Sequence, residues 1–260
     1  MDKLKAILKS TLFGLVMLLF LVLGAIIAKA LKLSANRTYI FQGSFMLLSI
    51  VVPLFFVGSQ NISFTEVGFN KQNKNIFKDL LFYIPLLVSL IPLVIFMKRG
   101  TSLKTMAVMF YFYLCVAIAA EIYFRGLIQH FLRGKFNIFV ALIFAAILFT
   151  ACNLYYFNRI TYIKHIIVLS LGMFGISLLT GLIIEKKGLL FFTMIFNALY
   201  FFLSAGFIKS GKRLVIGQGI CLAILFAYGV FMLITYMKKE KKEKIDNKET
   251  FDEEGNILLD

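Results

Sequence analysis

The sequence contains few charged residues, no tryptophan, and little histidine or cysteine. Only 16% of its 260 residues are charged, whereas 60% are hydrophobic. A soluble domain usually carries about 25% charged and about 45–50% apolar residues. The apolar excess therefore excludes an ordinary soluble globular domain and favours a chain that has lipid as its solvent.

The shortage of metal-binding side chains limits the possible chemistry. The two histidines, His130 and His165, lie near the ends of apolar runs, and Cys115, Cys152 and Cys221 each lie inside one, with no CxxC spacing. Zinc sites need about three protein ligands of the His, Cys or carboxylate type. We therefore expect no metal site, no disulfide and no cofactor, and we interpret the cysteines as small apolar helix residues.

The net charge of +15 does not indicate a nucleic-acid partner. The basic residues occur singly or in pairs between apolar runs, as the loop residues of membrane proteins do. They form no basic stripe interleaved with aromatic residues, which nucleic-acid binding would favour. The partner that composition predicts is the lipid bilayer.

Long apolar runs are the main feature that is present. A helix needs about 20 apolar residues to cross the hydrocarbon core. The sequence predicts about eight such helices, at 10–29, 38–58, 78–97, 105–129, 137–157, 164–184, 188–208 and 213–237. The fold class is therefore an all-α, polytopic integral membrane helix bundle, in which the first run is a retained helix rather than a cleaved signal.

The chain divides into a transmembrane domain, residues 1–237, and a charged tail, residues 238–260, which we expect to be disordered in part. An even number of spans places both termini on one side of the membrane. The lysines of the tail and of the basic N-terminus predict that this side is cytoplasmic. The lysine-rich, tryptophan-free composition suggests a multi-pass protein of the bacterial cytoplasmic membrane.

Polar side chains within the spans are the candidates for function. Of the thirteen acidic residues, Glu121 alone lies well inside a predicted span, where an ionisable side chain costs about 2.5–3.5 kcal/mol. Arg125 follows four residues later and can pair with it. Asn153 and Asn197 also lie inside spans, where amides usually bond across helices. We expect these four to meet in one buried cluster, as a structural brace or as a functional site.

Three segments carry a resemblance to a known family. Residues 120–129 resemble the EExxxR signature of the CPBP family, the CAAX proteases and bacteriocin-processing (Abi) membrane proteins. Residues 149–153 lie at the distance of its FxxxH signature, and residues 197–201 stand where its HxxxN signature belongs. Residues 64–69 are similar to the short loop before the family's core helices. The resemblance covers about residues 60–205 and implies a CPBP-like core.

The sequence departs from the family at the positions that carry catalysis. In active members, the resemblance implies, the first Glu and the FxxxH histidine activate water, and the third signature holds the oxyanion. Here these positions are Ala120, Asn153, Asn197 and Phe201. The second Glu and the Arg of the first signature remain. An asparagine amide has no accessible titration and cannot act as a general base.

The sequence therefore predicts a catalytically degenerate CPBP protein that binds a membrane protein or peptide. The roles that the resemblance implies include bacteriocin self-immunity and envelope regulation. One alternative is an active intramembrane endopeptidase with altered residues, using Glu121 as its base. A further alternative is a transporter or channel subunit, against which the shortage of charge within the membrane argues.

Overall fold

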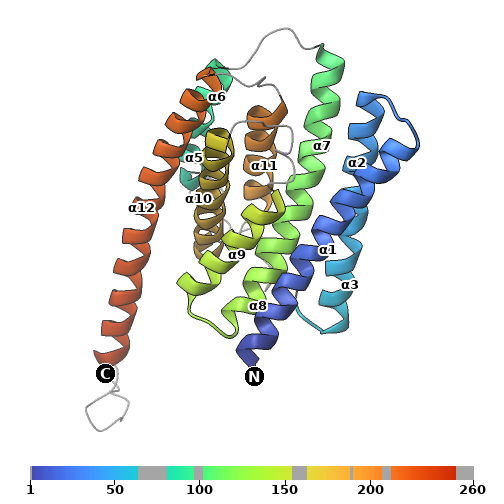
Figure 1. The fold of residues 1–260 in the computed structure, drawn as a ribbon. Helices are drawn as coiled ribbons and strands as arrows, with labels where there is room; N and C mark the ends of the chain where they lie inside the picture. The colour runs from blue at the N-terminus through green and yellow to red at the C-terminus, as the bar shows by residue number, and fades with distance from the viewer. Residues whose placement is uncertain are drawn as a thin grey trace.

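The protein is a bundle of α-helices with short irregular connections (Figure 1). The computed structural model describes residues 2–63, 81–96, 102–153, 163–187, 190–206 and 212–249. Its elements are α1 (Asp2–Ala30), α2 (Ala35–Ser49), α3 (Val51–Ser59), η1 (Leu81–Tyr83), α5 (Ile84–Ser89), α6 (Ile91–Ile95), α7 (Leu103–Glu121), η2 (Ile122–Ile128), α8 (Gln129–Arg133), α9 (Ile138–Asn153), α10 (Ile163–Lys187), α11 (Leu190–Phe201), η4 (Phe202–Gly206) and α12 (Lys212–Glu249). Among these described residues no strand occurs.

The described helices confirm the predicted class. Five are long and apolar enough to cross a membrane: Asp2–Ala30, Ala35–Ser59, Leu103–Arg133, Ile166–Glu185 and Ile216–Tyr236. Three shorter apolar helices complete the set: Leu81–Ile95, Ile138–Asn153 and Leu190–Ser204. Each corresponds to one of the eight segments that the sequence predicts.

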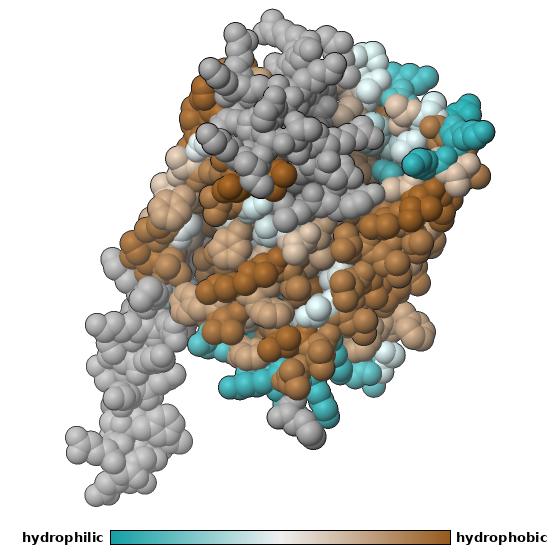
Figure 2. Space-filling model, in the orientation of Figure 1, coloured by the Kyte–Doolittle hydropathy of each residue, from teal (hydrophilic) through white to brown (hydrophobic). Residues whose placement is uncertain are grey.

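The surface is that of a protein embedded in lipid. Figure 2 shows a broad hydrophobic band, with hydrophilic residues gathered at the lower end and at the upper right. Large apolar side chains such as Leu19, Phe55 and Phe226 are exposed. A soluble protein rarely exposes so continuous an apolar surface, so this is a multi-pass membrane protein.

One continuous helix forms the centre of the bundle. It begins as α7, continues through η2 and ends with α8 (Figure 1). α7 packs against α2 and α11, while α10 packs against α9 and α12. α1 also belongs to the core, because Phe13 and Met17 are buried and the Phe13 ring stacks on Phe131 of α8. The π-helical part of the central helix, Ile122–Ile128, is therefore surrounded by protein rather than by lipid.

The third predicted span, 78–97, is not one continuous helix. The chain forms η1, α5 and α6, with an interruption at Leu90. Pro92 lies in the first turn of α6, and a proline cannot donate the backbone hydrogen bond that would continue a helix. Residues 78–80 and 97 lie outside the described residues.

The start of α1 and the described end of α12 lie at the same end of the bundle (Figure 1). There, the Lys135 ammonium lies 3.9 Å from the Asp2 carboxylate. α12 continues as a helix to Glu249, past the boundary that the sequence predicts at 237. Glutamates and lysines four residues apart favour that continuation. Residues 250–260, and the loop 64–69, lie outside the described residues.

Candidate functional site

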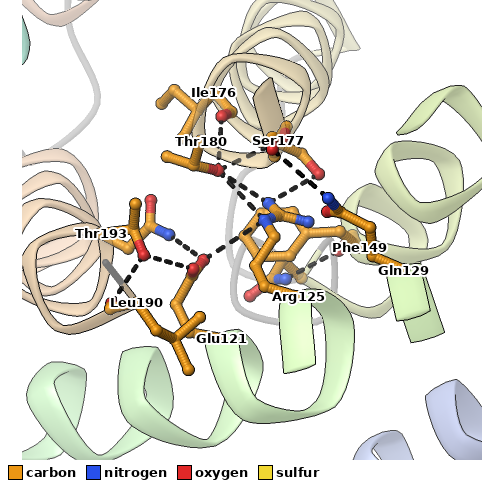
Figure 3. A network of polar contacts seen from close by, with 12 residues as sticks. Glu121, Arg125, Gln129, Phe149, Ile176, Ser177, Thr180, Leu190 and Thr193 are labelled. Atoms are coloured by element: carbon orange, nitrogen blue, oxygen red, sulfur yellow. Dashed lines mark hydrogen bonds and ion pairs between the residues drawn. The ribbon is translucent and has the colours of Figure 1, made fainter. Parts of the chain in front are cut away.

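Glu121 is the last residue of α7, and its carboxylate is completely buried. Both carboxylate oxygens are bound by side chains of α11 (Figure 3). The Thr193 hydroxyl donates to one oxygen at 2.7 Å, and the Asn197 amide donates to the other at 2.5 Å. Thr193 and Asn197 are four residues apart and thus share one face of α11. The carboxylate therefore joins α7 to α11.

Arg125 lies one turn further along, within η2, and is also buried. Its Nε atom is 3.7 Å from Oε1 of Glu121, so the predicted ion pair forms. The hydrogen bonds of the guanidinium, however, go to α10. Nε and Nη2 donate to the Thr180 hydroxyl at 3.2 and 2.9 Å, and Nη2 donates to Ser177 at 2.9 Å (Figure 3). The guanidinium also lies over the Phe149 ring of α9, 5.0 Å from its centroid.

The backbone around Arg125 departs from the α-helix. Residues Ile122–Ile128 form a π-helical stretch between two α-helical ones. In an uninterrupted α-helix, Arg125 would be the direct neighbour of Glu121 on one face. The wider turn alters that relationship, and π-helical turns are frequent at functional sites. Here the guanidinium donates hydrogen bonds to side chains of α10, whereas the carboxylate accepts hydrogen bonds from side chains of α11.

Asn153 is buried as expected but is not bonded to the other three predicted residues. Its Nδ2 donates to the Phe149 carbonyl on its own helix at 2.7 Å. Its Oδ1 has no hydrogen-bond partner within the described part of the chain, and the same holds for Oδ1 of Asn197. The structure therefore joins Glu121, Arg125 and Asn197 directly. It places Asn153 on α9, one turn after Phe149, whose ring lies against the Arg125 guanidinium.

Three hydroxyl residues of the site, Ser177, Thr180 and Thr193, were not predicted. Serine and threonine are common in apolar helices, where they usually donate to the carbonyl one turn earlier. Thr180 does this too, donating to the Ile176 carbonyl at 2.9 Å. Its oxygen remains free to accept from Arg125. The spacing of Ser177, Thr180 and Thr193 in the sequence does not indicate that they bind Arg125 or Glu121.

A second set of polar contacts continues along the central helix to its end. Gln129 donates from Nε2 to the Gly181 carbonyl at 3.3 Å and to Glu185 at 2.7 Å. Glu185 also forms an ion pair with Arg133. The sequence placed Glu185 in the connection after the sixth span. It lies instead within α10, which continues to Lys187.

No imidazole belongs to this site among the residues described. His130 is half-buried, with its ring edge-on to Phe131, and the His165 side chain lies outside the described residues. In the described ranges, no group of three His, Cys, Asp or Glu side chains could hold a metal ion. The site is a buried carboxylate and a buried guanidinium, each bonded to uncharged side chains.

Comparison with known proteins gives one match. Residues 102–203 match the family described as Type II CAAX prenyl endopeptidase Rce1-like. The matched segment is shorter than half of the chain, yet it begins just before α7, ends within η4, and contains the entire site. No curated protein and no solved structure matches. By this match, the segment of this multi-pass membrane protein that contains the site is similar to the Rce1-like (CPBP) family.

Proposed function

We propose that this protein does not hydrolyse peptides and instead acts by binding a membrane protein or peptide at the remnant of the family's site. Bacteriocin self-immunity and regulation of an envelope protein are the settings that we propose for such binding. One observation carries the proposal: both oxygens of the buried Glu121 carboxylate already accept hydrogen bonds, from Thr193 and Asn197.

The chemistry of the site supports the absence of hydrolysis. A general base must be able to accept a proton from the attacking water. The Glu121 carboxylate has a guanidinium beside it and a hydrogen-bond donor on each oxygen, so neither oxygen is free to take a proton from an attacking water. Ala120 and Asn153, which replace two of the family's catalytic positions, offer no titratable group.

The unpartnered acceptors at the site support binding. Oδ1 of Asn153 and Oδ1 of Asn197 are both buried without a hydrogen-bond partner in the described ranges. Leaving such an atom unsatisfied costs about 1–3 kcal/mol. A bound segment that donates N–H groups to these oxygens would recover that energy. The ligand that fits is therefore a peptide or a membrane protein segment with free backbone donors.

A cleavage assay tests the first half of the proposal. The purified protein in proteoliposomes is incubated with a peptide library and with prenylated CAAX peptides, beside a Glu121→Gln variant. We expect no product above the protein-free background from either protein. Cleavage by the wild type that Glu121→Gln abolishes would establish the alternative, an endopeptidase with Glu121 as its base.

Photo-crosslinking tests the second half. Phe201, which is buried and stacks on Phe149 with centroids 6.2 Å apart, is replaced by benzoylphenylalanine. The matched control is the same replacement at Phe226, which is 75% exposed on α12. We expect a protein or peptide adduct at Phe201 that is absent at Phe226 and is reduced by Asn197→Leu. Identical adducts at both positions would contradict binding at the site.

A further inference from the structure

Two lysines near the start of α1 lie on one face of the helix as a pair of like charges. Lys5 and Lys9 are four residues apart and both are exposed, so their side chains are neighbours that repel each other. The nearby Asp2 carboxylate pairs with Lys135 instead. Within the described residues, neither Lys5 nor Lys9 has an acidic partner. An anion between the two ammonium groups would turn this repulsion into attraction.

The Lys9 ammonium lies against aromatic rings from two other helices. It is 5.9 Å from the ring centroid of Phe56 on α3 and 6.0 Å from that of Phe131 on α8. These two rings meet edge to face with centroids 5.4 Å apart, and the Phe13 ring of α1 packs against both. A cation at this distance is attracted by the ring faces. The rings therefore restrict the Lys9 side chain, which reduces the entropy that is lost when it binds an anion.

The sequence of α1 places Lys9 at the depth of the lipid headgroups. Residues 10–28 carry no charged side chain, so Lys9 and Lys29 stand about 30 Å apart along the helix axis. This distance matches the thickness of the hydrocarbon core of a bilayer, about 30 Å. Lys9 therefore lies where the acyl chains end and the headgroups begin.

An exposed apolar stripe continues from the two lysines into the membrane. Leu12 and Leu19 follow Lys5 by about two and about four helical turns, so they lie on the same face. They are 59% and 53% exposed. Figure 2 shows hydrophilic residues below the hydrophobic band, at the end of the bundle where α1 begins. A ligand on this face meets positive charge at its head and an apolar surface along its length.

We propose that Lys5 and Lys9 bind an anionic phospholipid, with its phosphate between the two ammonium groups and its acyl chains along Leu12 and Leu19. The ammonium groups donate charge-assisted hydrogen bonds to the phosphate oxygens. A zwitterionic head brings a cation that the lysines repel, so a head with net negative charge, such as phosphatidylglycerol, is favoured. The competing occupant is the acidic segment 252–254 of the chain itself, which has no acyl chains to cover the leucines.

Native mass spectrometry of the delipidated protein tests the proposal by measuring the Kd for dioleoyl phosphatidylglycerol. Dioleoyl phosphatidylcholine has the same tails and a zwitterionic head, and we expect it to bind at least about tenfold more weakly. Glycerol phosphate, an anionic head without tails, should not displace the bound lipid at the same concentration. Equal affinity for the two phospholipids, or displacement by glycerol phosphate, would overturn the proposal.

Three variants locate the site on α1. Lys5→Gln and Lys9→Gln should each weaken phosphatidylglycerol binding about fivefold. Lys29→Gln removes the same charge from the other end of the same helix and is expected to change the Kd less than twofold. All three lysines are exposed, so the variants should melt like the wild type without added lipid. Equal weakening by Lys9→Gln and Lys29→Gln would contradict a site at Lys9.

A further variant tests the competing occupant. The three acidic residues of 252–254 are replaced together by their amides, and the Kd for phosphatidylglycerol is compared with that of the wild type. We expect a change of less than twofold. Phosphatidylglycerol binding that appears only in this variant would show that the acidic segment occupies the lysines, and it would overturn the proposal.

Discussion

Asn197 of α11 donates its side-chain amide to the Glu121 carboxylate of α7 at 2.5 Å, at a depth where neither group is exposed to solvent. Asn197→Leu keeps the volume of the side chain but removes one donor from a buried anion. We expect the free energy of unfolding to fall by about 1.5–3 kcal/mol, the range for hydrogen bonds to charged groups. Reversible unfolding by SDS in mixed micelles measures it.

Asn153→Leu is the matched control for that change. Asn153 is equally buried, but it donates only to the Phe149 carbonyl of its own helix. Its replacement by leucine should cost less than about 1 kcal/mol. Equal losses in the two variants would show that the Glu121–Asn197 bond contributes nothing specific to stability.

Thr180 accepts two hydrogen bonds from the Arg125 guanidinium. Thr180→Val has almost the same shape and lacks the acceptor, so two buried N–H groups lose their partner. We expect a loss of about 2–3 kcal/mol in the same unfolding assay. Thr150→Val, in which the hydroxyl bonds only the Ala146 carbonyl of its own helix, should change stability by less than about 1 kcal/mol. A Thr180→Val loss no larger than that of Thr150→Val would contradict the described role of Thr180.

How far the site could be predicted from the sequence depended on the chemistry of each residue. Glu121 and Asn197 were predictable because a carboxylate or an amide inside a span requires a partner. Thr180 and Thr193 were not, because a threonine in a helix usually satisfies itself on its own backbone. The π-helical stretch was not predictable either, since the residues of η2 differ little in apolar character from the α-helix before them.

The eight apolar segments were predictable because length and hydropathy alone determine what can cross a bilayer. Whether each segment forms one unbroken helix, and where that helix ends, was less predictable. The break at Leu90 depends on where Pro92 falls relative to the preceding turn, and the continuation of α12 to Glu249 depends on local charge spacing rather than on hydropathy.

The glycines of α10 differ in how closely they are packed. A Cβ at Gly181 would lie 2.5 Å from the Leu142 side chain and 3.0 Å from Oε1 of Gln129, whereas nothing lies within 4 Å of one at Gly175. Gly181→Ala should therefore destabilise the protein by about 1–3 kcal/mol, through overpacking. Gly175→Ala should be neutral, or stabilising by up to about 1 kcal/mol, because alanine favours the helix. Thermal melts in detergent compare the two, and a stabilising Gly181→Ala would refute the close packing of α9 on α10.

Restoring the family's residues tests the proposal that the site does not hydrolyse peptides. Ala120→Glu, Asn153→His, Asn197→His and Phe201→Asn together would supply the signature residues that this chain lacks. We expect peptide cleavage in proteoliposomes only from the combined variant, and its loss when Glu121→Gln is added. Folding is checked by a cooperative melt, because a charged group is added to a buried position. A well-folded combined variant without activity would contradict the idea that these four positions alone account for the proposed lack of hydrolysis.

The orientation in the membrane is testable with single cysteines, because the native ones are all buried. Lys5 and Lys135 are exposed at one end of the bundle, while Lys32 and Lys104 are exposed in segments that lie at the other. With the termini in the cytoplasm, Lys5→Cys and Lys135→Cys should react with a membrane-impermeant maleimide only in inside-out vesicles. Lys32→Cys and Lys104→Cys should react in intact cells. The reverse pattern would place the termini outside.

The wide turn of η2 has an effect beyond Arg125. Because such a turn holds more residues than an α-helical one, it sets the rotational phase of every residue that follows on the central helix. Deleting one residue while the wide turn is kept would turn α8 by about 100° relative to α7, and Gln129 and Arg133 would point away from Glu185 although none of the three had been mutated. Closing the wide turn to an α-helical one would absorb the same deletion and keep the three residues together. The length of this segment is thus as much a part of the buried polar network as the side chains that form it.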